Sequence, residues 1–389
     1  MNIRTVITAI VLLSLAACGG GGGSSSAPPT SPIGAPPTGP IGTPPTGPII
    51  SATQRTYNGT ASVGDFLITT INATAQTLSY VNKSNGDTAT VPYTVNADGT
   101  LALADPTGNL VAAYEVPGYA LLIEAQKTGP THSTPSLITA VVSGPISLAT
   151  LSAQTYNYMQ FRTSVGGIEV GSVAIDAAGN ITGSGYWPLG AFFNNTSAFH
   201  IINNPVTGLT ADPSGTFLKG NTTDSTDYIF GTANGQFIVD TTNGAILGLG
   251  RAATKAFDPN NAGTYTAMLY SKTNATTATG NIESGTVNLG IGKVTLDTTG
   301  NLVIKDAQGN TQLAGLLVPI ADAAYLNGPG QLVNPGNGLF TVRNVVPGVS
   351  QQDIFVSFQG RAMLFASFSS ALPMSGSNPY NYAYGAALH

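Results

Sequence analysis

The sequence predicts an all-β fold: tandem antiparallel meander modules, small barrels or sandwiches, after a disordered tether rich in Gly, Ser and Pro. Two observations predict it. Short apolar or Thr-rich runs are separated by Gly-containing pairs, where Gly supplies the positive φ of a tight hairpin turn. After the amino-terminal segment, the sequence has no long stretch in which apolar residues recur at helical spacing. The nearest candidate for a helix, 313–325, is interrupted by Pro319. The turn pairs are Asn85-Gly86, Asp98-Gly99, Ala178-Gly179, Ser214-Gly215, Asn234-Gly235, Asn243-Gly244, Thr299-Gly300 and Gln308-Gly309.

Composition agrees with an exposed all-β protein. Hydrophobic residues make up 42% of the 389 residues, which is enough for a substantial core. Charged residues make up only 8%, and without Arg4 the chain carries 12 basic and 18 acidic side chains, a formal charge of −6. Because the sequence has no basic stripe, we expect no nucleic-acid partner.

The amino terminus has the pattern of a signal peptide. Arg4 precedes an apolar stretch of 13 residues, 5–17, which is too short to span a bilayer. Leu15-Ala16-Ala17 then leads to Cys18, the only cysteine. This order resembles the lipobox of bacterial lipoproteins, in which the cysteine is diacylglycerylated, the chain is cut before it, and the new amino terminus is acylated. The alternative is an ordinary secretory peptide, 1–17, that happens to end next to a cysteine.

The resemblance implies that Cys18 is a lipidation site bearing palmitate-like chains. Residue 19 is Gly rather than Asp, which in lipoproteins similar to the enteric type implies release to the outer membrane. We therefore expect a bacterial cell-envelope protein, an outer-membrane lipoprotein whose periplasmic or surface orientation stays open.

Residues 18–50 are expected to form the lipidated cysteine and its tether. Gly and Ser fill 19–26, a flexible composition. An eight-residue Pro-rich repeat follows in three copies, 27–34, 35–42 and 43–50. Such a repeat favours the extended polyproline II conformation. At about 3.1 Å per residue, residues 27–50 would then span roughly 70–75 Å. We favour a stalk over a proline-rich ligand for a partner domain.

The remaining chain is expected to contain three β modules, at 51–150, 151–255 and 256–389. The pattern Thr-Tyr-x-x-Met-x-aromatic opens two of them, at 155–161 and 264–270, and Thr56-Tyr57 opens the first more loosely. We count about eight candidate strands per module and expect Met159, Met268 and Leu364 to be buried. The modules resemble lipocalin-like and transferrin-binding-lipoprotein barrels in general outline, but they match no diagnostic motif of either.

Two further features recur in each module. An Asx/Gly hairpin appears at 173–182 and 294–303, with a third version at 94–103. A Gly-led apolar strand closes each copy, at 118–123, 244–248 and 360–365. We expect the opening and closing strands to meet, with the Tyr of the opening strand facing inward and Thr and Asn facing outward.

Signals for catalysis or metal binding are weak. His132, His200 and His389 lack the spacing of a zinc site, and nucleophile-elbow, phosphate-loop and dinucleotide motifs are absent from the sequence. Most Asp residues occupy turn positions, and Asp258-Pro-Asn260 is interpreted as an Asx turn rather than a calcium loop. We therefore predict no metal, no cofactor and no catalytic residue.

Two aromatic clusters are the candidate ligand-binding residues. Tyr186 and Trp187 are expected in a Gly/Pro-rich loop with Phe192 and Phe193. Tyr380, Tyr382 and Tyr384 alternate, so that an extended strand would place three rings on one face. They could form a platform for a sugar or a protein, because aromatic rings supply large contact areas. The alternative is core packing for the first cluster and a barrel-sealing strand for the second.

The function expected from the sequence is a lipid-anchored envelope surface protein with a binding, adhesion or structural role. Its partners would be the membrane, through the lipid, and a glycan or protein ligand. A non-enzymatic role is favoured over the alternative, an extracytoplasmic hydrolase acting on polysaccharide or peptide. An outer-membrane pore is disfavoured, because the strands are short and lack paired aromatic girdles.

Overall fold

The chain divides into two units, residues 1–48 and 49–389. The computed structural model describes residues of the second unit, to which the following account is confined. The described residues are 53–126, 134–162, 167–186, 199–205, 207–221, 226–242, 244–252, 254, 256–275, 285–320, 337–346, 350–371 and 380–389. In this part of the chain, no helix has the length and apolar character needed to cross a membrane.

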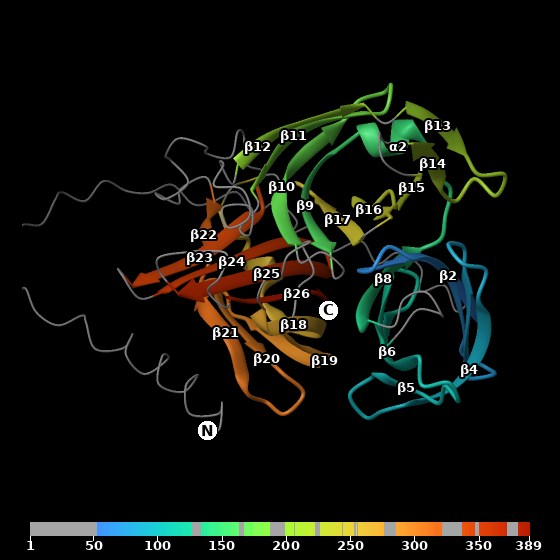
Figure 1. The fold of residues 1–389 in the computed structure, drawn as a ribbon, viewed down its shortest axis with the longest axis horizontal. Helices are drawn as coiled ribbons and strands as arrows, with labels where there is room; N and C mark the ends of the chain where they lie inside the picture. Colours follow the sequence, from blue (N-terminus) through green and yellow to red (C-terminus); the bar gives the residue numbers. More distant parts are fainter. Residues whose placement is uncertain are drawn as a thin grey trace, which may run out of the picture. The chain divides into compact units, whose positions relative to one another are not determined.

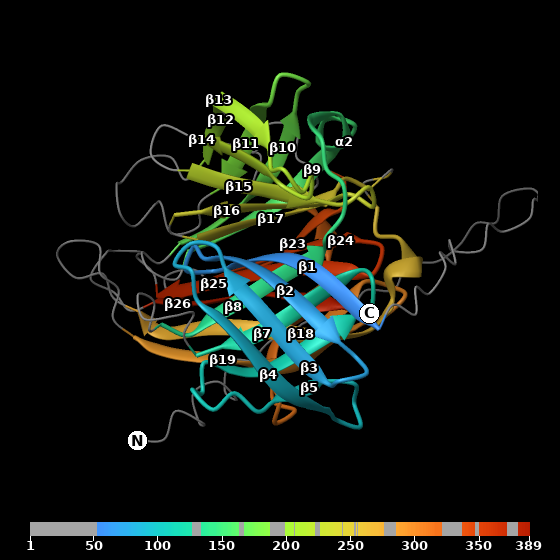
Figure 2. The ribbon, with the colours of Figure 1, turned by 90° about the vertical axis from the view of Figure 1, so that its right-hand side faces the viewer.

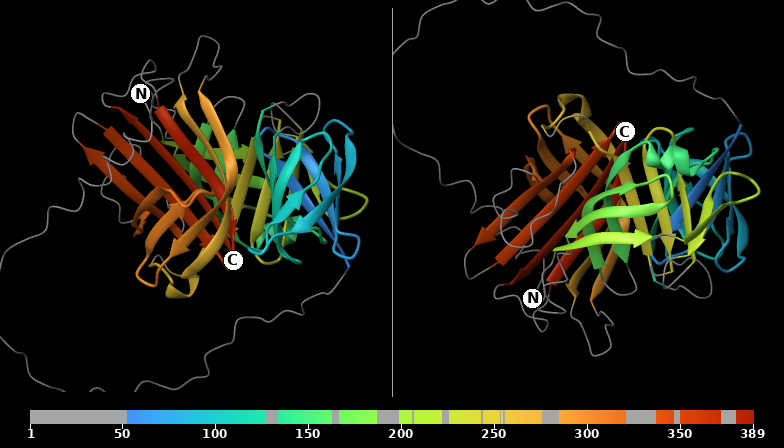
Figure 3. Two further views of the ribbon diagram at one scale, coloured as in Figure 1. Left: turned by 90° about the horizontal axis from the view of Figure 1, so that it is seen from below. Right: turned by 90° about the horizontal axis from the view of Figure 1, so that it is seen from above.

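The fold is all-β, as predicted, and consists of three antiparallel sheets (Figure 1). Each sheet uses one continuous stretch of chain, and the three are distinguished by colour in Figure 3. The helices among the described residues are short: α2, Leu148–Ser152, and the 3-10 turn η1, Pro259–Asn261. Asp258 caps η1 by accepting from the Asn260 backbone N–H at 2.9 Å, which confirms the Asx turn.

The first sheet is a closed barrel in which β1 pairs with both β2 and β8 (Figure 2). Its strands follow one another in sequence order around the barrel. They are β1 Gln54–Ala61, β2 Phe66–Asn72, β3 Thr77–Asn82, β4 Thr88–Val95, β5 Leu101–Leu103, β6 Leu110–Val116, β7 Ala120–Ala125 and β8 Ser136–Val142.

The second sheet has nine strands, with β9 paired to both β10 and β17. They are β9 Thr155–Arg162, β10 Gly167–Ile175, β11 Asn180–Tyr186, β12 Phe199–Pro205, β13 Thr207–Ala211, β14 Leu218–Asn221, β15 Thr226–Gly231, β16 Gln236–Thr241 and β17 Gly244–Gly250.

The third sheet also has nine strands, with β18 paired to both β19 and β26. They are β18 Gly263–Ala275, β19 Thr286–Leu296, β20 Asn301–Lys305, β21 Thr311–Leu316, β22 Val318–Pro319, β23 Leu339–Val346, β24 Ser350–Gln359, β25 Ala362–Ala371 and β26 Tyr380–Leu388.

All three sheets follow one eight-strand plan, in which the fourth strand changes partner along its length. In the first sheet, β4 pairs with β3 through residues 88–92 and with β5 through 93–95. In the second sheet the change of partner falls between β12 and β13, and in the third sheet it falls between β21 and β22. If each of these pairs is counted as one fourth strand, the second and third sheets have the eight-strand order of the first, and each is a closed or nearly closed barrel.

Proline residues lie close to each of these changes of partner. Pro92, Pro205 and Pro319 fall at or within two residues of the three switch points. Because proline cannot donate to a β-ladder, it is tolerated where a strand leaves one partner for another. This shared device, together with the common strand order, confirms that the chain repeats structurally.

The expected meeting of first and last strands is confirmed in outline and corrected in detail. The strand beginning at Gly244 is the last of its barrel and pairs with β9. The strands expected to close the other two copies, 118–123 and 360–365, correspond instead to seventh strands, β7 and β25. The last strands are β8 and β26, which pair with β1 and β18.

Seven of the eight predicted hairpin turns are confirmed. Gly has a positive φ in seven of the eight predicted pairs, and Asn243 of the eighth lies outside the described residues. The hairpins 173–182 and 294–303 occupy matching places, between second and third strands, whereas 94–103 joins the fourth and fifth strands. At the second-to-third position the first barrel uses Gln76, a non-glycine with φ 50°.

Each barrel has its own apolar interior, and the inward Tyr of each opening strand lies within it. Tyr57, Tyr156 and Tyr265 belong to the separate interior clusters of the first, second and third barrels. A fourth cluster, here called the shared core, is formed by outward-facing side chains of all three barrels. Its principal strands are β7, β8, β9, β10, β16, β17, β18, β25 and β26.

Met159, Met268 and Leu364 are buried, as predicted, but not inside their barrels. All three belong to the shared core. Met lies three residues after Tyr in the repeated pattern, so it must point to the opposite face of its strand. Asn58 and Thr60 face outward, as expected, and are buried against the second barrel.

The barrels contact one another in a cyclic order. The first strand of each barrel contacts the seventh strand of the next: β1 with β16, β9 with β25, and β18 with β7. The residue after each inward Tyr takes part in the same order. Asn58 donates to Thr216 O of the second barrel at 2.9 Å, and Asn157 donates to Asn337 O of the third at 2.8 Å.

The third contact completes the cycle through a lysine. Lys293 donates to Thr266 at 3.0 Å and its ammonium lies 4.0 Å from the carboxylate of Asp98 in the first barrel. Thr216, Asn337 and Asp98 all lie in turns between fourth and fifth strands. The three barrels are therefore related by an internal pseudo-threefold arrangement.

Candidate functional site

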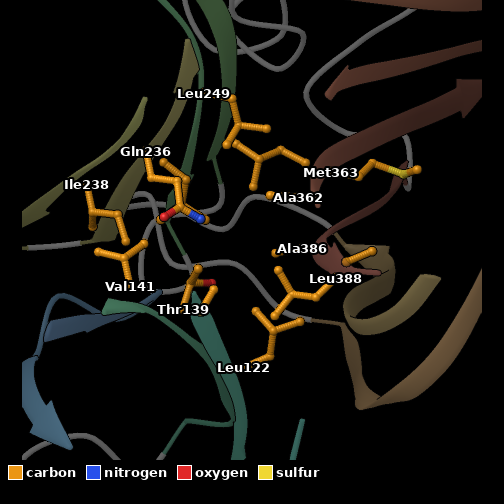
Figure 4. A pocket seen from close by; sticks show the side chains of 14 residues that line it. Leu122, Thr139, Val141, Gln236, Ile238, Leu249, Ala362, Met363, Ala386 and Leu388 are labelled. Carbon is orange, nitrogen blue, oxygen red and sulfur yellow. The ribbon is translucent and has the colours of Figure 1, made fainter. Parts of the chain in front are cut away.

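The centre of the pseudo-threefold arrangement is an apolar junction with a small cavity (Figure 4). Matching residues of the seventh and eighth strands of each barrel line it. Its volume is about 30 Å³, room for about two water molecules by the usual minimum of ~10–15 Å³ each. The matching residues are Ala120, Leu122, Thr139 and Val141, then Gln236, Ile238, Leu247 and Leu249, then Ala362, Leu364, Ala386 and Leu388. The junction therefore serves packing rather than binding of an organic ligand.

Two of the three predicted tyrosines of the last strand, Tyr382 and Tyr384, lie in the shared core. Tyr384 stacks on Phe161 of the second barrel with ring centroids 4.2 Å apart, and on Tyr270 at 4.7 Å. Tyr382 is also buried and lies 6.3 Å from Tyr270. These rings hold two barrels together, and β26 seals the third barrel between β25 and β18. Two of the three rings of the expected surface platform are therefore buried in the core.

The other predicted residues are placed as follows. Tyr186 ends strand β11 rather than lying in a loop, and it is buried in the shared core with its ring 5.6 Å from that of Phe355. Tyr380 begins β26. Trp187 and the lipidation candidate Cys18 lie outside the described residues, so neither prediction is tested by the structure.

The mouth of the first barrel interior holds a polar group that sequence reasoning did not find. Arg55 donates two hydrogen bonds to Glu115, at 2.6 and 2.7 Å, and the Tyr57 hydroxyl donates to the same carboxylate at 2.5 Å. The hydrogen bond to Glu115 raises the pKa of Arg55, and burial raises that of Tyr57. The carboxylate is neutralised by an adjacent guanidinium, an arrangement that stabilises the barrel end rather than preparing an acid for catalysis.

The second barrel encloses a different pair. Tyr158 donates a hydrogen bond to Glu169 inside the barrel, where both side chains are buried. Burial, and then the adjacent carboxylate, raise the pKa of Tyr158, because both disfavour a second negative charge. The only sequence signal for this pair was Glu169 within an otherwise apolar strand.

The contact surface between the first and second barrels, called here the first seam, combines aromatic packing with a buried acid. The Phe66 ring lies 5.0, 4.9 and 5.3 Å from those of Phe217, Tyr228 and Phe230. Beside them, Thr60 donates to Asp240 at 2.5 Å. Burial raises the pKa of Asp240 well above its ordinary value, and Asp65 and Asp227 raise it further, while the Thr60 hydrogen bond lowers it.

One glutamine connects all three barrels. Gln359 accepts at its side-chain oxygen from the Gly250 backbone N–H, 2.8 Å, and at its backbone oxygen from the Tyr119 hydroxyl, 3.2 Å. Tyr119, Gly250 and Gln359 come from the first, second and third barrels respectively. Sequence alone offers no signal for such a contact, because a turn glutamine resembles any surface residue.

The described residues contain no group of three His, Cys, Asp or Glu placed to hold a metal ion. His132 lies outside them, and His389 packs its ring 5.1 Å from Tyr265. The alternative hydrolase would require two acids at a cleft or His200 beside a serine. Glu115, Glu169 and Asp240 lie in three separate places, each held by its own hydrogen-bond partner.

Comparison with known proteins assigns no family. No protein-family model matches the chain, and no curated protein matches it in sequence.

Proposed function

We propose that this protein is a lipid-anchored component of the bacterial cell envelope with a structural, adhesive or binding role. Cys18 carries the lipid, residues 19–50 act as a stalk, and the three-barrel body is held away from the membrane. Each acyl chain contributes about 0.8 kcal/mol per buried CH₂, and stable anchoring needs about two chains. A triacylated Cys18 exceeds that requirement.

The observation that carries a structural role is the shared core. Part of the outward face of each barrel packs against the other barrels in the shared core, and each barrel interior is filled by its own side chains. Closed barrels expose no long strand edge, which protects a surface protein from edge-to-edge aggregation. These features favour a compact body that presents an outer surface over one that encloses a substrate.

The outer surface of the first barrel offers uncharged hydroxyl groups to a partner. Thr56, Thr70, Ser79 and Thr90 lie in register across four neighbouring strands. Thr56 and Thr70 are 3.2 Å apart, and Ser79 and Thr90 are 2.9 Å apart, oxygen to oxygen. Such a row suits a neutral polar ligand such as a glycan or a protein surface.

The anchor is tested by Cys18→Ser, compared with Ser24→Ala in the tether as the matched control. In the original host, labelled palmitate and detergent-phase partition are measured for each chain. We expect the control to be labelled and membrane-bound, and Cys18→Ser to be unlabelled and soluble or unprocessed. Unchanged labelling and partition of Cys18→Ser would contradict the proposal.

A further inference from the structure

The three seams differ at one matching position of the seventh strand. Two residues beyond Ile238, Leu122 and Leu364, which line the central cavity in the same way, the seventh strands carry Asp240, Glu124 and Ala366. The opposing first strands differ as well. At the third residue after the inward Tyr, the first barrel has Thr60 where the others have Met159 and Met268. In the first seam, therefore, the acid Asp240 lies opposite the hydroxyl of Thr60, whereas the first strands of the other two seams carry a methionine at the position of Thr60.

Asp240 is deeply buried and sparsely bonded. Its side chain is 3% exposed and receives one hydrogen bond, from Thr60 at 2.5 Å. Its cross-strand partners Tyr228 and Ala245 both face the first barrel with it. An ionised carboxylate would need two or three donors to replace its lost hydration, so this site favours the neutral acid.

The charged groups around Asp240 oppose its ionisation. Asp65 approaches from the turn between β1 and β2, and Asp227 acts from β15. β17 contributes the uncharged Ala245, and on β1 the ionisable groups Arg55 and Tyr57 are bonded to Glu115 inside the barrel. Among the described residues, the charged groups that act on Asp240 are both acids, so they add to the cost of a negative charge there rather than offset it.

The seam has little room to adapt to a charge. Gly64, at φ 93°, packs so closely on the second barrel that an added Cβ would lie 2.4 Å from Thr241 O. The Phe66 cluster fills the adjoining space. Hydrating an ionised Asp240 would therefore require the two barrels to separate locally.

We propose that the first seam is a pH-sensitive joint, closed while Asp240 carries its proton and loosened when the carboxylate forms. The sign follows from linkage, since a group with a raised pKa stabilises the closed state at low pH and loses that effect as pH rises. Its use in the cell depends on the proposed extracytoplasmic location, where the body experiences the pH of the medium. The joint itself does not depend on lipidation.

The joint is tested by hydrogen exchange of the full chain in detergent from pH 4.5 to 8, corrected for intrinsic exchange rates. Protection in β1, β16 and the 61–66 turn should fall by about tenfold per pH unit until Asp240 is ionised. Asp240→Asn should remove this dependence. Glu124→Gln, the variant at the matching position of another seam, should retain it.

Two results would overturn the proposal: the same pH dependence in Asp240→Asn and the wild-type chain, or its loss in Glu124→Gln instead. If Asp240→Asn does not fold, carboxyl-carbon NMR of the wild-type chain replaces it. If an Asp carboxyl carbon titrates in the pH range in which the protection of the seam falls, the joint is supported. If the protection falls and no Asp carboxyl carbon titrates in that range, the joint is contradicted. None of these results depends on the fate of Cys18, so failure of the joint is distinguishable from failure of the anchor.

Discussion

Met159 and Met268 occupy the same place in successive barrels, and both are fully buried. Each follows its inward Tyr by three residues and points outward, into the shared core. Each Met is thus part of the repeated sequence pattern of its own barrel and also part of the contact between barrels. This dual position explains why the pattern Thr-Tyr-x-x-Met contains two large apolar residues on opposite faces of one strand.

Replacing either Met with Asp should destabilise more than the barrel that carries it. A buried, unpaired carboxylate in the shared core should lower the free energy of unfolding by about 3–5 kcal/mol. Chemical denaturation measures this loss. Met159→Leu and Met268→Leu, which nearly conserve volume, should cost less than about 1.5 kcal/mol. Asp variants as stable as the Leu variants would show that these positions are not packed as described.

Individual strands and turns were largely predictable, because alternation and turn glycines act locally. Gly at positive φ marks seven of the eight predicted turns. The turn at Gln76 could not be predicted in this way, because the residue with positive φ there is not a glycine. There Asn72 fixes the turn instead, by accepting from the backbone N–H groups of Thr74 and Ala75.

The last strands were harder to assign than the first. β8 and β26 lack the leading Gly that precedes β7 and β25, so the sequence pattern predicts the penultimate strands as the closing ones. The candidate ligand tyrosines show the same limit. Alternation predicts that Tyr382 and Tyr384 share a face, but it cannot tell whether that face meets solvent or another barrel.

The tether is expected to be independent of the barrels. Residues 27–42, two copies of the Pro-rich repeat, offer no apolar face to bury. Their deletion should leave the melting temperature of the chain unchanged within error in a calorimetric comparison. A fall of several degrees would show that the repeat docks on the body.

At the scale of the whole molecule, three barrels share one core arranged in a cycle. Each barrel contacts the next through its first strand and the partner's seventh strand, so removal of any one exposes apolar surface on both others. Sequence reasoning could identify the repeat but not this cycle. The outward residues that build it, such as Asn58 and Asn157, look like ordinary polar surface residues until their partners are known.

The central claim is that the three barrels behave as one cooperative body. Urea unfolding at pH 5, followed by hydrogen-exchange mass spectrometry, reports β1–β8, β9–β17 and β18–β26 separately in a single experiment. The shared core predicts one midpoint common to peptides from all three barrels. Three separated midpoints, with one barrel remaining protected after another has unfolded, would contradict it.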